Sequence, residues 1–174
     1  LSERQVRTLM EAWRDRVAEL SEHSYIRHIA PFENRGEEVG VTLFHPHGQI
    51  YAYSYLPPRV IKMLEVAKAH REETGRVLFD DVVARELRDG VRIIARNEHW
   101  VAYTPYASRY PFEIHVVPLQ PVADLTELSP AACDSFPPIA IEVMQRLDGV
   151  FGIEMAYIAA WHQAPKVENE TSSV

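Results

Sequence analysis

The chain has 174 residues, 47% of them hydrophobic, which is enough to bury a core as one domain or as two small ones. Its formal net charge is −7 at pH 7 and Lys and Arg do not cluster, which argues against nucleic-acid binding. No apolar run reaches the roughly 18–20 residues of a membrane span, and the single Cys133 excludes a disulfide framework and a Cys-x-x-Cys zinc pair. We therefore expect a soluble, cytoplasmic protein with no nucleic-acid and no membrane partner.

The first half of the chain alternates helical and extended patterns. Ser2 and Gln5 have the spacing of a capping box, and apolar residues then recur at helical spacing, which predicts an amphipathic helix to about residue 20. The elements expected after this helix are a strand over 25–32, a turn over 33–36, extended chain over 39–53, and helices over 60–70 and 80–87.

Sheet structure is expected to dominate the second half. Its predicted elements are hairpin strands over 91–96 and 99–103, a third strand over 112–117, a helix from 130 to about 147, and a last strand over 154–161. Because proline lacks a backbone N–H, Pro137-Pro138 is expected to interrupt or restart the long helix. The polar segment 166–174 is expected to be a frayed tail.

Two imidazoles and a carboxamide alternate along the segment His45-Pro46-His47-Gly48-Gln49. Side chains at every second position of a strand project to the same face, so His45, His47 and Gln49 are expected to share one face. Two neutral imidazoles and a neutral amide suit a site that handles a phosphate group without repelling it. This segment is therefore the candidate catalytic site.

Several blocks of sequence occur in a fixed order around this motif. They are Phe32-Glu33-Asn34-Arg35-Gly36, Glu98-His99-Trp100-Val101-Ala102, Pro105-Tyr106, Tyr110-Pro111-Phe112-Glu113 and Trp161-His162-Gln163-Ala164-Pro165. Together with the histidine motif they resemble the galactose-1-phosphate uridylyltransferases, a branch of the histidine-triad superfamily. The blocks match only the later part of a full-length member of that family.

The resemblance implies an α+β fold, in which a histidine-triad-like antiparallel sheet with flanking helices forms part of a two-repeat architecture. On this interpretation the chain divides into the end of a first repeat, a connector, a second and degenerate repeat, and the tail. The corresponding ranges are 1–56, 57–97, 98–165 and 166–174.

The resemblance assigns catalysis to two residues of the motif. The second histidine, His47, corresponds to the family nucleophile, which attacks the α-phosphorus of a nucleotide sugar and becomes covalently uridylylated. Gln49 corresponds to the family glutamine that donates to a nonbridging phosphoryl oxygen, where a carboxylate would repel the charge. Both roles are expectations from the resemblance.

Four further residues are expected to bind substrate. Asn34 and Thr42 occupy family positions that contact nucleotide or phosphate. Gly48 allows the backbone to approach the phosphate closely, and the loop that contains Gly40 can point backbone amides at the same oxygens.

Two histidines match family metal ligands, but both sites are incomplete in this chain. His45 matches a zinc ligand, yet tetrahedral zinc takes about four ligands and the usual Cys-x-x-Cys pair is absent, so zinc is expected only if amino-terminal ligands are supplied. His162 matches one ligand of a second metal, but the expected downstream His-x-His is absent and Met63 replaces a glutamate. The second metal site is therefore incomplete as well.

The leading hypothesis is a UDP-glucose–hexose-1-phosphate uridylyltransferase of galactose metabolism, which exchanges UDP-glucose and galactose 1-phosphate through a uridylyl-His47 intermediate. Because roughly half of the family's length is unmatched, we expect one part of a split or truncated enzyme, with a complementary amino-terminal half chain, a homodimer, or both. Two alternatives stay open: another histidine-triad nucleotidyltransferase or phosphorylase, and a catalytically silent subunit.

Overall fold

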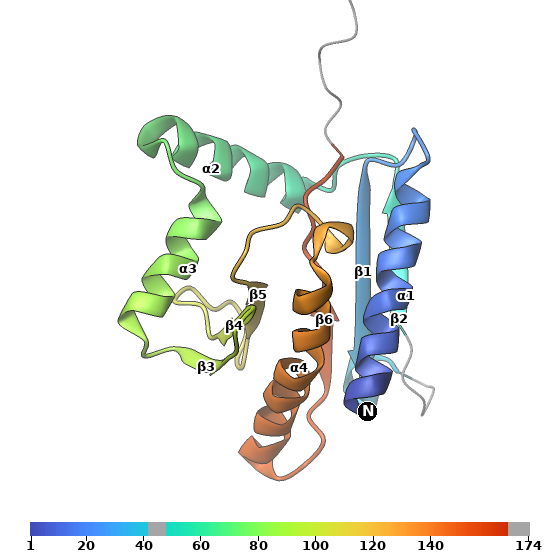
Figure 1. Ribbon diagram of the computed structural model, residues 1–174, viewed down its shortest axis with the longest axis vertical. Helices are drawn as coiled ribbons and strands as arrows, with labels where there is room; N and C mark the ends of the chain where they lie inside the picture. The colour runs from blue at the N-terminus through green and yellow to red at the C-terminus, as the bar shows by residue number, and fades with distance from the viewer. Residues whose placement is uncertain (42–47, 167–174) are drawn as a thin grey trace, which may run out of the picture.

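The computed structural model describes residues 1–41 and 48–166, and these form four α-helices and two three-stranded antiparallel sheets (Figure 1). The helices are α1 (Glu3–Ser21), α2 (Pro58–Thr74), α3 (Leu78–Asp89) and α4 (Pro130–Phe151). The strands are β1 (His28–Arg35), β2 (Gly48–Tyr53), β3 (Ile93–Arg96), β4 (Trp100–Tyr103), β5 (His115–Pro118) and β6 (Tyr157–Ala160). The α+β class predicted from the sequence is confirmed.

The first sheet has the order β2-β1-β6, so its central strand pairs with one neighbour close in sequence and with one far away. In the β1–β2 pair, Phe32 lies opposite Gln49 and Glu33 lies opposite Gly48. In the β1–β6 pair, Glu33 also lies opposite Ala159. The central strand therefore sets the position of the candidate catalytic segment relative to the carboxyl-terminal part of the fold.

Helix α1 forms as the sequence predicts and packs its apolar stripe into the core. The side chain of Ser2 accepts a hydrogen bond from the backbone N–H of Gln5, and the side chain of Gln5 accepts one from the backbone N–H of Ser2, which completes a capping box. The buried residues of this helix recur at helical spacing: Val6, Met10, Trp13 and Val17. They face α4 and the first sheet.

The predicted turn over 33–36 is wrong, because β1 continues through Glu33 to Arg35. All three of these residues pair with β6, which is remote in sequence, and Glu33 also pairs with β2. The chain turns only at Gly36, which has a φ of +105°. A Cβ there would lie 2.5 Å from the Cβ of Ala156, so glycine is required by both its backbone angle and its neighbour. Extended chain from residue 39 is also wrong at its start, because Glu37–Val39 forms a 3-10 turn.

The predicted interruption of the long helix at Pro137-Pro138 is also wrong, because α4 runs without a break from Pro130 to Phe151. Each proline removes the N–H that would bond the carbonyl four residues earlier. Pro137 is buried and Pro138 is exposed, so the helix accommodates one ring in the core and one at the surface.

Side chains from the β3–β4 hairpin bind carbonyl groups in the same turns of α4. The indole Nε1 of Trp100 donates to the carbonyl oxygen of Ala132 at 2.8 Å, and Nδ2 of Asn97 donates to that of Ser135 at 2.7 Å. These tertiary hydrogen bonds hold the helix against the second sheet on either side of Cys133 and Asp134, whose carbonyl groups lose their helical donors to the two prolines.

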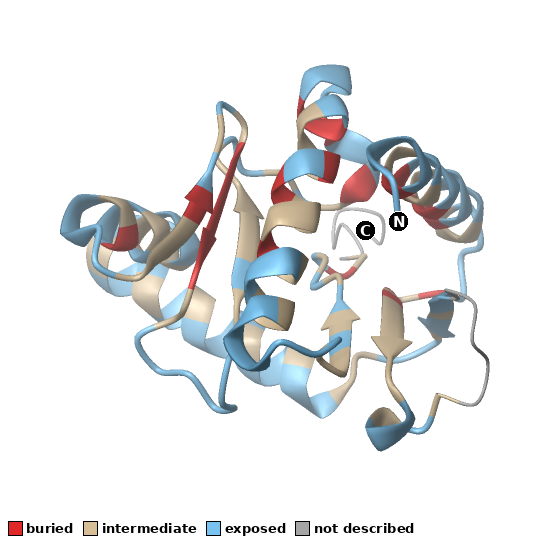
Figure 2. Ribbon diagram, turned by 90° about the horizontal axis from the view of Figure 1, so that it is seen from below, coloured by how far each residue is buried: buried red, intermediate tan, exposed pale blue. Residues whose placement is uncertain are grey.

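The second sheet, β3-β4-β5, follows the predicted hairpin and third strand. All four residues of β4 are buried (Figure 2), with α4 packed against this sheet. Figure 2 also shows buried residues along the inner faces of α1 and α4. The core therefore lies where α1, α4 and the two sheets meet.

Helices α2 and α3 form an arm on the side of the molecule away from α1 (Figure 1). Both extend beyond the ranges predicted from the sequence, and among its residues α2 has no buried side chain. A hydrogen bond of 2.8 Å between Nε2 of His70 and Oδ2 of Asp81 joins the two helices. Helices α2 and α3 therefore contact each other more than they contact the core.

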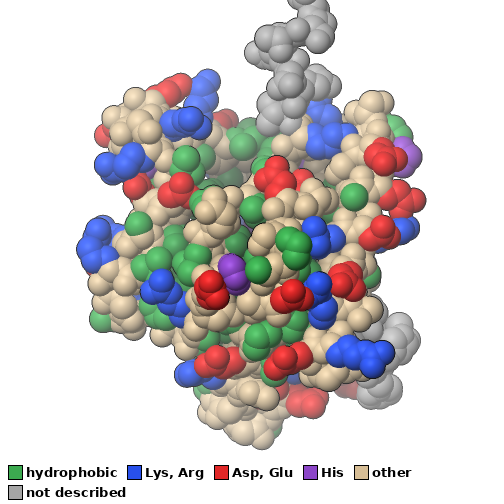
Figure 3. Space-filling model, in the orientation of Figure 1, with side chains coloured by type: hydrophobic (Ala, Val, Ile, Leu, Met, Phe, Trp, Pro, Cys, Tyr) green, Lys and Arg blue, Asp and Glu red, His purple; other side chains and the backbone are tan. Residues whose placement is uncertain are grey.

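The surface carries both signs of charge. On the face in Figure 3, acidic and basic side chains are interspersed rather than gathered by sign, as the absence of charge runs in the sequence predicts. In the described ranges, no helix combines the length and apolar character that crossing a bilayer requires.

Candidate active site

The structure describes part of the predicted catalytic segment. Gly48 and Gln49 are the first two residues of β2, and both are exposed. Thr42, His45 and His47 lie outside the described residues, so their predicted roles stay predictions.

Gln49 points to the face of the first sheet that is turned away from the helices. It lies opposite Phe32, and because paired residues share a face, both side chains project to the same side. The Phe32 ring in turn lies 4.8 Å from the ring of Tyr51. Gly48, one residue earlier, faces the other way, toward Trp13 of α1. A carboxamide donor and an aromatic row therefore lie on the open face.

Asn34 shares this open face with Phe32, because it lies two residues along β1. Its Oδ1 atom is buried and, within the described part of the chain, has no hydrogen-bond partner. A buried acceptor without a donor costs free energy, and such groups occur where a ligand or another chain supplies the donor. The position is consistent with the predicted contact to substrate and does not test it.

Gly40 ends the short 3-10 turn Glu37–Val39, with a φ of +81°. Its N–H donates to the carbonyl oxygen of Glu37 at 2.9 Å, so this amide is used inside the turn. The amides of Val39 and Val41 also donate within the turn, to the carbonyl oxygen of Gly36. The role of this loop in binding anions stays a prediction.

The helix-facing side of β1 carries a cluster that sequence analysis did not identify. The hydroxyl of Tyr157 donates to Oε1 of Glu33 at 2.9 Å, and the guanidinium of Arg35 lies 4.9 Å from the centroid of the Tyr157 ring. Arg35 also pairs with Asp148. No local signal could have found it, because 124 positions separate Glu33 from Tyr157 in the sequence.

Burial dominates the ionisation of this cluster. It raises the pKa of Glu33, and the hydrogen bond from Tyr157 and the charge of Arg35 offset only part of that effect. Burial, followed by the charge of Glu33, raises the pKa of Tyr157. The pair therefore stays as a phenol donating to a carboxyl group beside Gly48 in the sheet register.

His162 follows β6, and its side chain keeps solvent access. The protein atoms that crowd its ring still desolvate it and lower its pKa, and the positive charge of Arg59 and other nearby cationic side chains lowers it further. The same positive charges would repel a metal ion. In residues 1–41 and 48–166, no three His, Cys, Asp or Glu groups gather as metal ligands. The described residues around His162 do not fit a metal.

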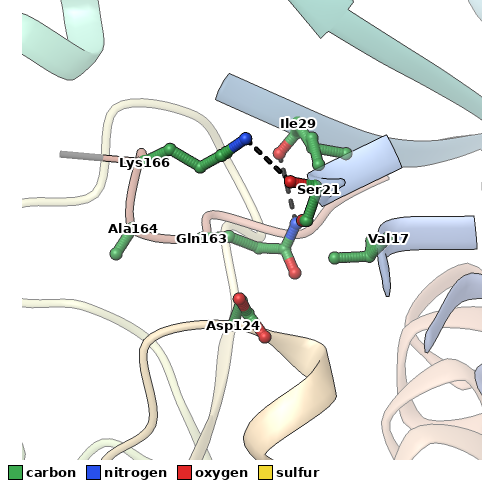
Figure 4. A pocket seen from close by; sticks show the side chains of 7 residues that line it. All are labelled: Val17, Ser21, Ile29, Asp124, Gln163, Ala164 and Lys166. Carbon is green, nitrogen blue, oxygen red and sulfur yellow. Dashed lines mark hydrogen bonds between the residues drawn. The ribbon is translucent and has the colours of Figure 1, made fainter. Parts of the chain in front are cut away.

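A small cavity of about 20 Å³ lies at the end of α1 (Figure 4). Lys166 spans it by donating to the carbonyl oxygens of Ser21 and His23, and Nε2 of Gln163 donates to that of Ile29 at 3.2 Å. A space of this size holds about one water molecule. These side chains therefore tie the end of the chain to α1 and β1 and do not form a substrate pocket.

The fold is that of the uridylyltransferase class of α+β proteins. A solved structure described as that of a uridylyltransferase superposes with a TM-score of 0.88, at 30% identity, covering 97% of this chain and 52% of that one. The galactose-1-phosphate uridylyltransferase of Streptomyces lividans is 46% identical over 169 residues, which cover 95% of this chain and 48% of that protein.

Two family models match consecutive parts of the sequence. The amino-terminal domain of galactose-1-phosphate uridyl transferase matches residues 1–57, and its carboxyl-terminal domain matches residues 62–174. The chain belongs to the galactose-1-phosphate uridylyltransferase family, as the resemblance predicted. It spans about half the length of the curated relatives that it matches.

An ADP-glucose phosphorylase of Arabidopsis thaliana is also similar. It is 30% identical over 110 residues, which cover 63% of this chain and 30% of that protein. Enzymes with different nucleotides therefore occur among the relatives.

Proposed function

We propose that this chain carries part of a cytoplasmic UDP-glucose–hexose-1-phosphate uridylyltransferase. The part of the family fold that this chain does not span, the complementary half, completes the enzyme. The observation that carries the proposal is the placement of Gln49 on the open face of the first sheet, opposite Phe32 and one strand from Asn34. The 46% identity to the Streptomyces protein supports the choice of UDP-glucose and galactose 1-phosphate as substrates.

The proposed reaction proceeds in two displacements at one phosphorus atom. A ring nitrogen of His47 attacks the α-phosphorus of UDP-glucose, a P–N bond forms, and glucose 1-phosphate leaves with the electrons of the broken P–O bond. A phosphate oxygen of galactose 1-phosphate then attacks the same phosphorus, which releases His47 and forms UDP-galactose. One difficult exchange becomes two easier steps.

Gln49 stabilises the negative charge that develops on the phosphoryl oxygens in both steps. Its side-chain NH₂ donates to a nonbridging oxygen, and the neutral amide avoids the repulsion that a carboxylate would cause. Asn34 binds substrate from the neighbouring strand. Its buried Oδ1 has no hydrogen-bond partner among the described residues and accepts a hydrogen bond from the substrate. The carboxamides lie on adjacent strands of one rigid sheet, which favours fixed geometry.

In this proposal, zinc binds only if ligands from outside this chain complete its coordination. His45 would hold it together with ligands that the complementary half supplies, and the ion would then stabilise the assembled fold rather than take part in the displacement. The second metal has no place in the proposal, because the surroundings of His162 do not fit it.

A phosphorylase acting on ADP-glucose is the second candidate function, because a phosphorylase of that kind is among the relatives. Both activities use a nucleotidyl-histidine, so the motif does not separate them. Competition between UDP and ADP for the chain separates them directly. Preferential displacement by UDP supports the uridylyltransferase, and preferential displacement by ADP supports the phosphorylase.

The experiment for the leading proposal supplies the unmatched half from the Streptomyces lividans relative by co-expression. With UDP-glucose and galactose 1-phosphate, we expect UDP-galactose to form with the pair, and not when His47→Ala replaces the parent chain. A stable complex that forms no UDP-galactose would contradict the proposal and favour a catalytically silent subunit.

A further inference from the structure

The indole ring of Trp13 packs directly beneath Gly48, the residue that precedes Gln49. A Cβ added to Gly48 would lie 3.2 Å from Cζ2 and 3.3 Å from Nε1 of Trp13, and 3.3 Å from the carbonyl oxygen of Phe32. These separations are shorter than ordinary van der Waals contacts between carbon atoms. The backbone of β2 therefore rests on the indole at this residue, with no space for a side chain between them.

The ring of Trp13 is itself held from several sides. It is 8% exposed and belongs to the buried stripe of α1. Its centroid lies 5.8 Å from that of Trp161, with the planes at 72°. The backbone N–H of Trp161 donates to the carbonyl oxygen of Pro31 at 2.9 Å, which fixes Trp161 to the central strand. The surface under Gly48 is therefore rigid.

We propose that Trp13 is a positioning residue for the candidate catalytic segment, and this proposal rests on the function proposed above for Gln49. The indole sets the height of the Gly48 backbone above α1, and Gln49 projects to the opposite face from that point. Through this contact α1 becomes a support of the site, although it contributes no group to the open face.

If Trp13 only stabilised the core, replacing it would lower stability without moving Gln49. Trp100 is the matched control for this loss of core packing. Trp100 is fully buried and belongs to the same aromatic cluster, with its ring 6.4 Å from that of Trp161. Its indole hydrogen bond reaches Ala132 of α4, on the side of the second sheet. Replacing it disturbs the core without touching Gly48.

The test compares Trp13→Phe with Trp100→Phe in the full chain. The phenyl ring lacks the atoms Cζ2 and Nε1 that underlie Gly48, so we expect the nuclear Overhauser contacts between the Gln49 side-chain amide and the Phe32 ring, which lie opposite each other, to weaken in Trp13→Phe. In Trp100→Phe we expect these contacts to stay, although its melting temperature falls at least as far. Unchanged contacts in Trp13→Phe, or equal losses in both variants, would overturn the proposal.

The rate at which the uridylyl adduct forms then tests this inference separately from the proposed function. With saturating UDP-glucose, in the presence of the complementary half, we expect adduct formation in Trp13→Phe to slow by about 10- to 100-fold, the range expected for misplacement on the scale of 1 Å. An unchanged rate in Trp13→Phe would count against the inference. If the parent chain takes no adduct, the proposed function fails, while the NMR comparison still decides whether Trp13 positions Gln49.

Discussion

Glu33 places a partly buried carboxyl group on the helix-facing side of β1, next to Gly48 in the sheet register. Burial raises its pKa, so the folded protein holds a proton there more tightly than the unfolded chain does. Stability therefore decreases as the pH rises from the ordinary pKa of glutamate, about 4.3, through the raised pKa of the folded state.

Replacing Glu33 removes this dependence on pH. We expect Glu33→Gln to keep an acceptor for the Tyr157 hydroxyl and to gain stability relative to the parent chain as the pH is raised from about 4 to about 7. Urea unfolding at a series of pH values measures the difference. Glu37→Gln, at an exposed position, is the control and should run parallel to the parent chain. Parallel curves for Glu33→Gln would show that the carboxyl group is not perturbed.

For single residues, the sequence predicts the chemical role of a side chain better than it predicts which side chains surround it. The alternation of His45, His47 and Gln49 predicts a phosphate site because residue types and spacing are local information. The Glu33–Tyr157 contact is not local, and Glu33 looked like a turn residue beside Asn34 and Gly36. The pairing of Glu33 with both β2 and β6, and of Asn34 with β6, shows that these residues are in a strand.

Helix α4 shows the same limit at the scale of an element. Its start at Ser129-Pro130 is predictable, because a capping serine and a first-turn proline act locally, and Ser129 accepts a hydrogen bond from the N–H of Ala132 at 3.1 Å. Its run through Pro137-Pro138 is accompanied by tertiary hydrogen bonds from outside the helix, which Trp100 and Asn97 donate to the carbonyl oxygens of Ala132 and Ser135. No pattern within the helix could reveal them.

Asn97 is therefore expected to stabilise α4 as well as its own hairpin. Its Oδ1 accepts from the N–H groups of His99 and Trp100, while its Nδ2 donates to Ser135. We expect Asn97→Ala to lower the free energy of unfolding by about 1–3 kcal/mol, because partners are left without hydrogen bonds. Gln145→Ala, at an exposed position on the same helix, should change it by less than about 0.5 kcal/mol. Urea denaturation of both variants measures this, and equal small effects would contradict the assigned role.

At the scale of the whole molecule, the resemblance of ordered sequence blocks predicts the α+β class and the family, and both are confirmed. The division into two repeats at residues 56 and 97 stays a prediction. The blocks carry this information because they record the family's residues directly, whereas the joining of β1 to β6 across more than a hundred residues depends on packing.

Exposed apolar side chains lie on the open face of the first sheet and on the arm of α2 and α3. In the described ranges, β2 and β6 are the two edges of the first sheet, and Tyr51 and Tyr55 are exposed at or next to β2. On the arm, Ile61 and Phe79 are exposed. Under the proposed function, the part of the family fold that this chain does not span would cover such apolar surface.

The proposed reaction requires that a nucleotide become covalently attached to His47. The intact mass of the chain after incubation with UDP-glucose shows this, with and without the complementary half, for the parent and for His47→Ala. We expect a mass increase of one uridylyl group on the parent chain and none on His47→Ala. A parent chain that stays unmodified in the assembled complex, or a His47→Ala chain that is modified equally, would contradict it.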